Sequence, residues 1–436
     1  MKLSKLNIES FRHLENLDFD FTYPKDYKDA TKVGKPLDKI CFIGQSATGK
    51  TGLLELIYAQ FDSYSSLLFN LDAKNYFIAN DFIKNITFEF EINNINVRKS
   101  DDGLYFDNKV YKEAKQIVNI QSFKKNSQFL KLYFFKSNLV SEENISILNQ
   151  HPLELIEKYK DILGGDQRTI LEFSNKIDAD IWHRFFKDIL NYRKRLNQRL
   201  VELIGKGLIS DLKKINREIQ KFHKDNPNPV EDFALVFDSI LSKLNLKVEI
   251  NNTEYIVPIE NQLTKEVIPI QNTSTGTKGL LLSFLPLYKL DTKDSIILID
   301  EPERSLYPDM QMELMEHYQN LAPEAQFIVA THSPFIAASF EPEERFILYF
   351  DEKGKVAVRR GISPIGDDPN DMLYNDFGVN YYNKDVQKKF KQYIALLDKV
   401  KSENDKNLKK KYILEASKIG NHYNFILDEK NQERLK

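Results

Sequence analysis

Residues 44–51 constrain the fold of this chain more than any other stretch. They read GQSATGKT, in which two glycines, a lysine and a threonine stand at the spacing G-x-x-x-x-G-K-[ST]. KICFIGQ before them predicts a short apolar strand, and TGLLELIYAQF after them has the apolar period of a helix. Gly44 and Gly49 let the backbone wrap closely around a phosphate, which the helix N-terminus attracts. An isolated polar turn is the alternative, but this context favours a phosphate site, with Lys50 on the β- and γ-phosphates of ATP and Thr51 presenting its hydroxyl to Mg²⁺.

Two later apolar runs end in polar residues that fit the same chemistry. SIILIDEPE predicts a buried strand that delivers Asp300 to Mg²⁺ and Glu301 to an attacking water. An acidic strand end that caps a helix is the alternative, since Pro302 and Glu303 suit a helix start. VATHSP places His332 at the end of another apolar strand, where an imidazole can stabilise the γ-phosphate and the water.

A second anion-binding pattern lies in NTSTGTKGLLL. Ser274 and Gly276 stand just before a helix expected to begin near Lys278, and a hydroxyl with free N–H groups suits a phosphate. The chain already has one phosphate loop, so a second one suggests closure on the nucleotide of another subunit. An ordinary helix cap is the alternative.

The composition excludes several classes of protein. Lys and Arg (62) nearly balance Asp and Glu (64) among 436 residues, so no global charge draws the chain to nucleic acid. Cys41 is the only cysteine, which rules out an internal disulfide and fits a reducing compartment. No apolar run of 18 residues occurs, and the first residues have no apolar signal-peptide core. We therefore expect a cytoplasmic chain with no membrane span.

The order of the motifs divides the chain into four expected parts. An N-terminal lobe with the phosphate loop and a β-rich subdomain is predicted over 1–141, and a helical insertion over 142–232. A C-terminal lobe over 233–362 carries the Ser274, Asp300 and His332 motifs. A helical tail follows over 363–436.

These motifs, in this order, resemble the ABC-type ATPases of the RecF/SMC/OLD branch. GQSATGKT matches the Walker A loop, STGTKG resembles the signature, IILIDEPE matches Walker B, and VATHSP matches the switch histidine. ERSLYP looks like the D-loop region, and the opening KLSKLNIESFRHLENLDF resembles the first hairpin of that branch. The signature departs most, with Thr273 and Thr277 at positions that usually hold other residues. The resemblance implies an α/β fold: a P-loop NTPase with an antiparallel β-subdomain, an inserted helical subdomain and a small helical tail.

The resemblance also implies a role for each matching residue. Glu301 would be the hydrolytic base beside His332, Asp300 and Thr51 would hold Mg²⁺, and Ser274 and Gly276 would act on a partner's γ-phosphate. Ser305 or Asp309 would help at the dimer seam. A Q-loop glutamine should follow the early β-rich region, and Gln121 is the first candidate, with Gln128 as the alternative.

The tail, with GDDPNDMLYNDFGV and short helices, resembles stand-alone ATPases of bacterial anti-phage systems such as Septu and retrons. The resemblance implies a homodimer or higher homo-oligomer that controls a separate nuclease-type effector. The chain itself lacks the acidic pattern of a Toprim nuclease and the histidine pattern of an HNH nuclease. A DNA-repair ATPase that acts directly on DNA and a nucleotide-gated scaffold with little turnover are the alternatives. The interrupted ATPase core argues against a transporter subunit.

The helical insertion adds one open question about partners. Its basic residues are dense, from Arg184 through Lys194, Arg195 and Arg199 to Arg217, which suits a stripe of DNA-phosphate contacts. A solvated face of an amphipathic helix pair explains the same charges. Apolar residues recur at helical spacing, so one face packs somewhere, and a protein partner is as compatible as DNA.

Overall fold

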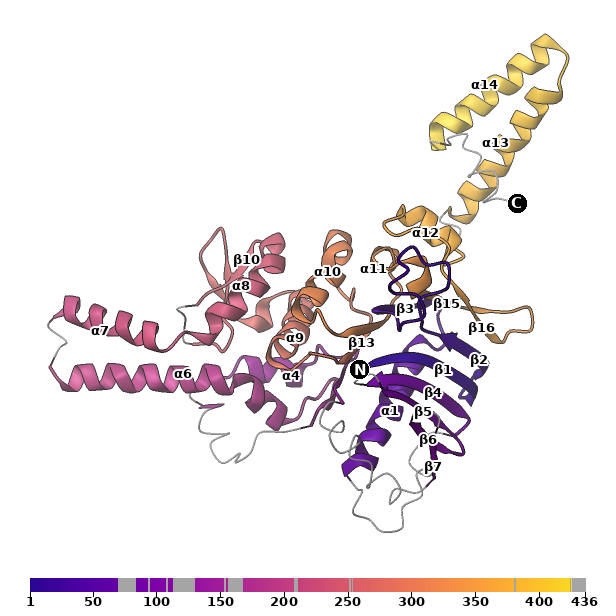
Figure 1. Cartoon of the computed structure of the whole chain (residues 1–436). Helices are drawn as coiled ribbons and strands as arrows, with labels where there is room; N and C mark the ends of the chain where they lie inside the picture. The colour runs from indigo at the N-terminus through magenta and orange to yellow at the C-terminus, as the bar shows by residue number, and fades with distance from the viewer. Residues whose placement is uncertain are drawn as a thin grey trace. The chain divides into compact units, whose positions relative to one another are not determined.

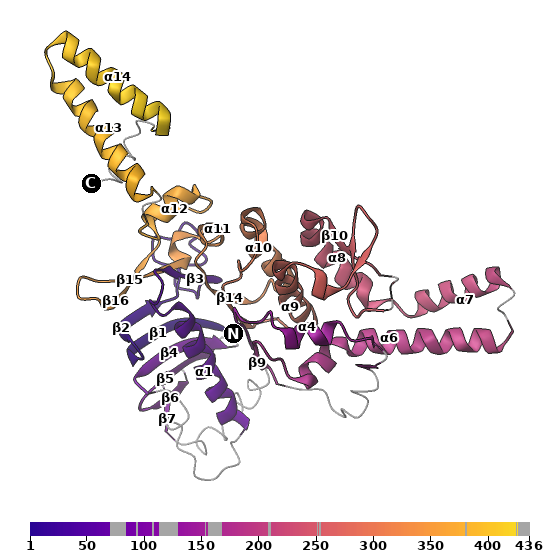
Figure 2. The ribbon, with the colours of Figure 1, turned by 180° about the vertical axis from the view of Figure 1, so that it is seen from behind.

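The computed structural model describes residues 1–69, 84–92, 95–106, 109–112, 130–152, 154–155, 168–207, 211–250, 252, 254–379, 382–423 and 425. The chain forms two compact units, Met1–Gly361 and Ile362–Lys436. Figure 1 and Figure 2 show the elements of the first unit from opposite sides. Each unit is described by itself.

A seven-stranded sheet carries the motifs of the first unit. Its order is β16-β15-β3-β14-β13-β8-β9, and every neighbouring pair is parallel except β15 with β16. The strands are β3 (Lys39–Gly44), β8 (Leu132–Phe135), β9 (Ile170–Phe173), β13 (Ile296–Asp300), β14 (Gln326–Ala330), β15 (Arg345–Phe350) and β16 (Val356–Arg360). The short apolar runs of the sequence are therefore buried parallel strands, and the predicted α/β fold is confirmed.

A second, antiparallel sheet has the order β2-β1-β4-β5-β6-β7. Its strands are β1 (Lys2–Phe11), β2 (Leu14–Asp20), β4 (Ile86–Ile92), β5 (Ile95–Ser100), β6 (Gly103–Phe106) and β7 (Lys109–Tyr111). Helix α1 (Lys50–Phe69) packs between this sheet and the central one, as Figure 1 shows for its place beside β4 and β5. The ring of Phe61 lies 5.6 and 5.0 Å from those of Phe88 and Phe90 on β4. One apolar core thus joins both sheets and fixes the helix that follows the phosphate loop.

The first unit contains seven further α-helices among its described residues. They are α4 (Glu142–Leu148), α6 (Ala179–Gly205), α7 (Leu212–Asp225), α8 (Pro229–Leu241), α9 (Thr275–Lys289), α10 (Pro308–Leu321) and α11 (Pro334–Ala337). A three-stranded sheet of β10 (Leu246–Val248), β11 (Ile259–Asn261) and β12 (Val267–Ile268) lies among them. Two of these helices, α6 and α7, extend away from the central sheet in Figure 1. Strand β9 falls inside the stretch predicted to be helical. Its short apolar run pairs with β8, a long-range contact that local periodicity does not reveal.

Helices α6 and α7 run side by side as an antiparallel hairpin (Figure 1, Figure 2). The Tyr192 hydroxyl lies 2.8 Å from Nδ1 of His223, and Arg199 forms an ion pair with Glu218 across the hairpin. Helix α6 ends at Gly205. Helix α7 has no buried residue, so its outer face is free to meet solvent or a partner.

The second unit contains α12 (Pro369–Asn375), α13 (Lys384–Ser402) and α14 (Lys406–Tyr423). Helices α13 and α14 form a hairpin around a small core of Phe390, Tyr393, Ala416 and Phe425. Over the described residues of both units, we find no helix with the length and hydropathy that crossing a membrane requires.

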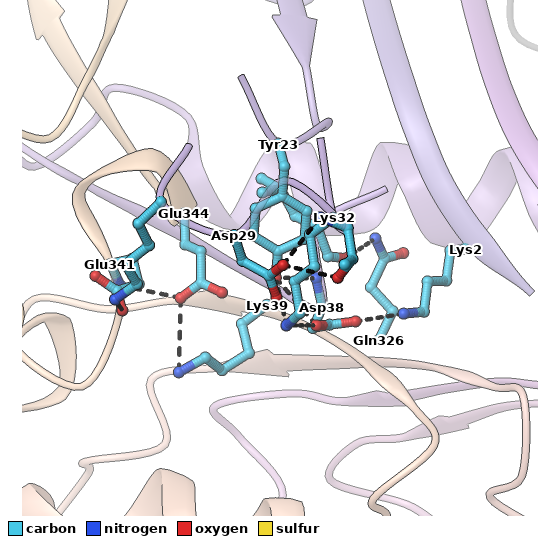
Figure 3. Close-up of polar contacts among 12 residues, drawn as sticks. Lys2, Tyr23, Asp29, Lys32, Asp38, Lys39, Gln326, Glu341 and Glu344 are labelled. Carbon is cyan, nitrogen blue, oxygen red and sulfur yellow. Dashed lines mark hydrogen bonds and ion pairs between the residues drawn. The ribbon is translucent and has the colours of Figure 1, made fainter. Parts of the chain in front are cut away.

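The amino ends of the parallel strands lie in a polar network, drawn in Figure 3. The carboxylate of Asp38, just before β3, accepts from Lys2, from Lys32 at 2.7 Å and from the Tyr23 hydroxyl at 3.0 Å. The fully buried amide of Gln326, the first residue of β14, donates to the carbonyl oxygens of Leu3 and Leu37 and accepts from the N–H of Leu3. The polar groups of Asp38 and Gln326 at the amino ends of these strands are therefore paired within the chain.

Candidate functional site

The phosphate loop joins the carboxyl end of β3 to α1. Gly44 has φ of 140°, and a Cβ there would lie 1.9 Å from the carbonyl oxygen of Leu348 on β15. Gly49 has φ of 91°, and its Cβ would lie 2.9 Å from Leu14 and 3.1 Å from Nε2 of His13. Both positions therefore require glycine, Gly44 because of the β15 backbone and Gly49 because of the first hairpin. The sequence motif alone does not show these contacts.

Lys50 begins α1 and its side chain is directed back over the loop. Its ammonium donates to the carbonyl oxygens of Gly44 at 3.0 Å and Gln45 at 2.9 Å. Burial lowers the pKa of Lys50 to about 8, against the opposing effect of the nearby Asp300 and Glu301 carboxylates. A phosphate in the loop would replace these carbonyl partners with a stronger acceptor.

Thr51 and Asp300 bring the two best-matched motifs into contact. The Thr51 hydroxyl lies 3.0 and 3.2 Å from the two carboxylate oxygens of Asp300, across 249 residues of sequence. Burial raises the pKa of Asp300, and the Thr51 and Ser137 hydroxyls oppose that effect. A hydroxyl beside one carboxylate fits Mg²⁺, which takes oxygen ligands and completes its shell with phosphates and water. Thr51 and Asp300 are therefore the candidate ligands. The described part of the chain has no cluster of three or more His, Cys, Asp or Glu that could hold a metal.

Glu301 and His332 follow neighbouring strands. Glu301 has φ of 50°, and its N–H donates to the carbonyl oxygen of Ala330 at 2.8 Å, which holds this unusual conformation. The backbone N–H of His332 donates to Oε1 of Glu303 at 2.8 Å. Burial, followed by the charge of Lys50, lowers the pKa of His332, so its imidazole is neutral at pH 7. Glu303 was predicted only as part of a helix start, and the structure instead makes it the anchor of the histidine loop.

The signature residues lie at the start of α9. The Ser274 hydroxyl accepts from the N–H of Thr277 at 3.1 Å, so it caps the helix, which begins at Thr275 rather than near Lys278. A Cβ on Gly276 would lie 2.5 Å from the carbonyl oxygen of Ser305, in the loop after β13. Close packing within one chain thus explains this glycine, and Ser274 itself remains exposed.

The remaining prediction for this edge, Gln121, lies outside the described residues, as does its alternative Gln128. The described residue that follows β8 is Lys136, which forms an ion pair of 3.1 Å with Glu172 on β9. Glu55, one turn after Thr51 on α1, accepts from Arg12 at 2.8 Å. Only Arg12 had a sequence signal, through its place in the opening hairpin. Lys136, Glu55 and Glu172 stand in different motifs or in none, so no local pattern joins them.

Comparisons with known proteins identify the family of the chain. The family model described as AAA ATPase domain, AAA_15, matches residues 1–337, which confirms the family-level resemblance. The "Retron Vc95 probable ATPase" of Vibrio cholerae serotype O1 biovar El Tor is 24% identical over 243 residues, 50% of this chain and 46% of that protein. The "Septu protein PtuA" of Bacillus thuringiensis is 33% identical over 72 residues, 16% of this chain and 18% of that protein. The chain therefore spans less than half the length of these relatives.

Solved structures of SMC head domains also align with the chain. The head from Thermotoga maritima has a TM-score of 0.41 and 11% identity, and covers 83% of this chain and 100% of its own. A head from Pyrococcus furiosus, bound to the C-terminal domain of ScpA, has a TM-score of 0.37 and 17% identity, and covers 82% and 96%.

Proposed function

Because the chain belongs to the AAA_15 family of AAA ATPase domains, we propose that it binds and hydrolyses ATP and that two subunits close on the nucleotide. The observation that carries the proposal is the Thr51–Asp300 contact beside Lys50. It joins a phosphate loop and a metal carboxylate at one edge of the sheet. When bound there, Mg²⁺ would neutralise charge on the phosphates.

The residues of the chain have separate tasks in this proposal. Lys50 and the N–H groups at the start of α1 bind the phosphates. Glu301 accepts a proton from the attacking water, and neutral His332 orients that water or the γ-phosphate. The hydrogen bond from Glu301 to Ala330 fixes the backbone from which this carboxylate extends.

Dimer closure is proposed from the start of α9. Ser274 is exposed at the N-terminus of a 15-residue helix, where a phosphate of another subunit is favoured by the helix dipole. We propose further that closure controls a separate nuclease-type effector in anti-phage defence. The names of the retron and Septu relatives support this step.

The test uses Glu301→Gln, which keeps the shape of the side chain but cannot accept the proton. We expect ATP turnover to fall by roughly a hundredfold or more while ATP binding persists. Native mass measured in Mg-ATP should then double relative to the nucleotide-free sample. Glu316→Gln, on the exposed face of α10, is the matched control and should behave as the unaltered chain. A variant that binds ATP yet stays monomeric would exclude the closure step.

The hairpin of α6 and α7 favours a second candidate, an ATPase that acts directly on DNA. Lys213, Arg217, Lys221 and Lys224 recur along one side of α7, all exposed. Within the described part of the chain, no carboxylate forms an ion pair with them. If DNA binds here, Arg217→Ala with Lys221→Ala should weaken duplex binding and reduce the slope of log affinity against log salt by about 2. Unchanged binding, or binding that ignores salt, would argue for a protein partner instead.

A further inference from the structure

The end of β8 brings a lysine to the nucleotide edge of the sheet. β8 pairs in parallel with β13, so Lys136 leaves β8 at the same edge at which Asp300 ends β13. The N–H of Lys136 donates to the carbonyl oxygen of Phe173 at 2.9 Å, which fixes the backbone there. Lys136, Asp300 and Glu301 line one small cavity. A lysine therefore borders the same cavity as the residues that would handle the phosphates.

This lysine belongs to a row of alternating charges beside α1. Arg12 donates to Glu55 at 2.8 Å, the Lys136 ammonium lies 4.0 Å from Glu55, and it lies 3.1 Å from Glu172. Glu55 and Thr51 are one helical turn apart and so share a face of α1. The row thus runs from the first hairpin, past the N-terminus of α1, to β9.

The geometry lets the ammonium change partners. The side chains of Lys136, Glu55 and Glu172 are 24%, 32% and 31% exposed, so their ion pairs are partly screened and weak. The Thr51 hydroxyl contacts Asp300 at the end of β13, and the Glu55 carboxylate pairs with Lys136 just after β8. The pitch of an α-helix is about 5.4 Å, so an anion held beside Thr51 would lie about one turn from Glu55, which the ammonium now faces. A terminal phosphate is a stronger acceptor than either carboxylate, because it carries more charge.

We propose that Lys136 is a second cation of the nucleotide site, which leaves Glu172 and binds the γ-phosphate, so that the chain discriminates ATP from ADP. The inference deepens the proposed function and rests on it. Lys50 serves both nucleotides through the β-phosphate, whereas Lys136 stands at the far side of Asp300 from β14 and the loop that carries His332. Glu172 then acts as the competitor that holds the ammonium when no γ-phosphate is present.

The experiment compares Kd for Mg-ADP and for a non-hydrolysable Mg-ATP analogue by calorimetry. Lys136→Met should raise Kd for the analogue about tenfold and change Kd for ADP less than twofold. Glu172→Gln should lower Kd for the analogue about threefold, because it frees the ammonium. The gain should disappear in the double variant, since Glu172 acts only through Lys136. Lys131→Met is the matched control, because Lys131 precedes the same strand at its opposite end and pairs with Asp291.

The possible results separate the inference from the function on which it rests. If the unaltered chain binds neither nucleotide, the proposed function fails. If it binds both and Lys136→Met weakens both equally or neither, the assignment of Lys136 to the γ-phosphate is overturned. A gain from Glu172→Gln that survives in the double variant overturns it as well, and does so even if Lys136→Met alone proves unstable.

Discussion

Strands β3 and β14 begin and end in opposite chemical surroundings. At their amino ends, Asp38 and Gln326 meet their hydrogen-bonding partners within the chain, as Figure 3 shows. After the carboxyl end of β3, Lys50 is bonded within the described residues only to loop carbonyls. Beside the end of β14, Glu303 from the loop after β13 keeps a buried carboxylate oxygen without a partner among those residues. The two ends of these strands therefore have different tasks. Paired polar groups at the amino ends hold the strands together, and polar groups with few partners at the carboxyl ends are available for a ligand.

The largest expected effect is a loss of ATP affinity at the carboxyl ends of the strands, with stability unchanged. Lys50→Ala removes the charge that we propose binds the β- and γ-phosphates, so ATP affinity should fall roughly a thousandfold, about 4 kcal/mol. The melting temperature should change little, because the variant also removes a buried ammonium that costs free energy to desolvate. Calorimetric titration and thermal unfolding check the two halves. Affinity that survives would remove the phosphate loop from the proposed site.

A matched pair of glutamines tests whether the two edges are separable. Gln326→Leu leaves the N–H and carbonyl of Leu3 and the carbonyl of Leu37 without partners, so the free energy of unfolding should fall by about 3 kcal/mol. Gln311 on α10 instead accepts from the Ser333 hydroxyl at 2.6 Å, next to His332. Gln311→Leu should cost less than about 1 kcal/mol of stability, yet lower kcat about tenfold. Urea unfolding and steady-state turnover of both variants measure the contrast, and parallel losses in both would contradict it.

The smallest expected effect is the pH dependence of the stability that Asp38 contributes at the amino ends of the strands. Burial opposes ionisation of Asp38, but Lys2 and Lys32 outweigh it and lower the pKa of its carboxyl to about 2. This pKa is lower in the folded state than the value of about 4 expected for an unfolded chain, so the stabilisation is complete above pH 4 and is lost as pH falls toward 2. Partial exposure screens the pair and reduces its worth to about 1 kcal/mol. Unfolding of Asp38→Asn should therefore vary less between pH 5 and 2 than that of the unaltered chain.

Local patterns predicted the parts of the site that lie within single motifs. The strand–loop–helix around Lys50 and the apolar run ending at Asp300 follow from period and composition, because each is one strand with its following loop. Strand β9 was missed, since four residues of a sheet edge depend on pairing with β8. The need for glycine at Gly44 and Gly276 could be seen only when Leu348 and Ser305 were in place. The row through Lys136 joins four separate elements and has no sequence signature.

The strand order has a consequence for how the protein is made. β3 and β8 are early in the chain, and β13 and β14, which lie between them in the sheet, are translated last of the four. At 5–20 residues per second, the 249 residues between Thr51 and Asp300 take roughly 12–50 s to synthesise. During that time the nascent chain carries the GQSATGKT loop without Asp300, the carboxylate proposed to hold Mg²⁺, and β13 and β14 must later insert between β3 and β8. The proposed nucleotide site thus exists only in the finished sheet, and a product that stops in the helical insertion would have the motif but not the site.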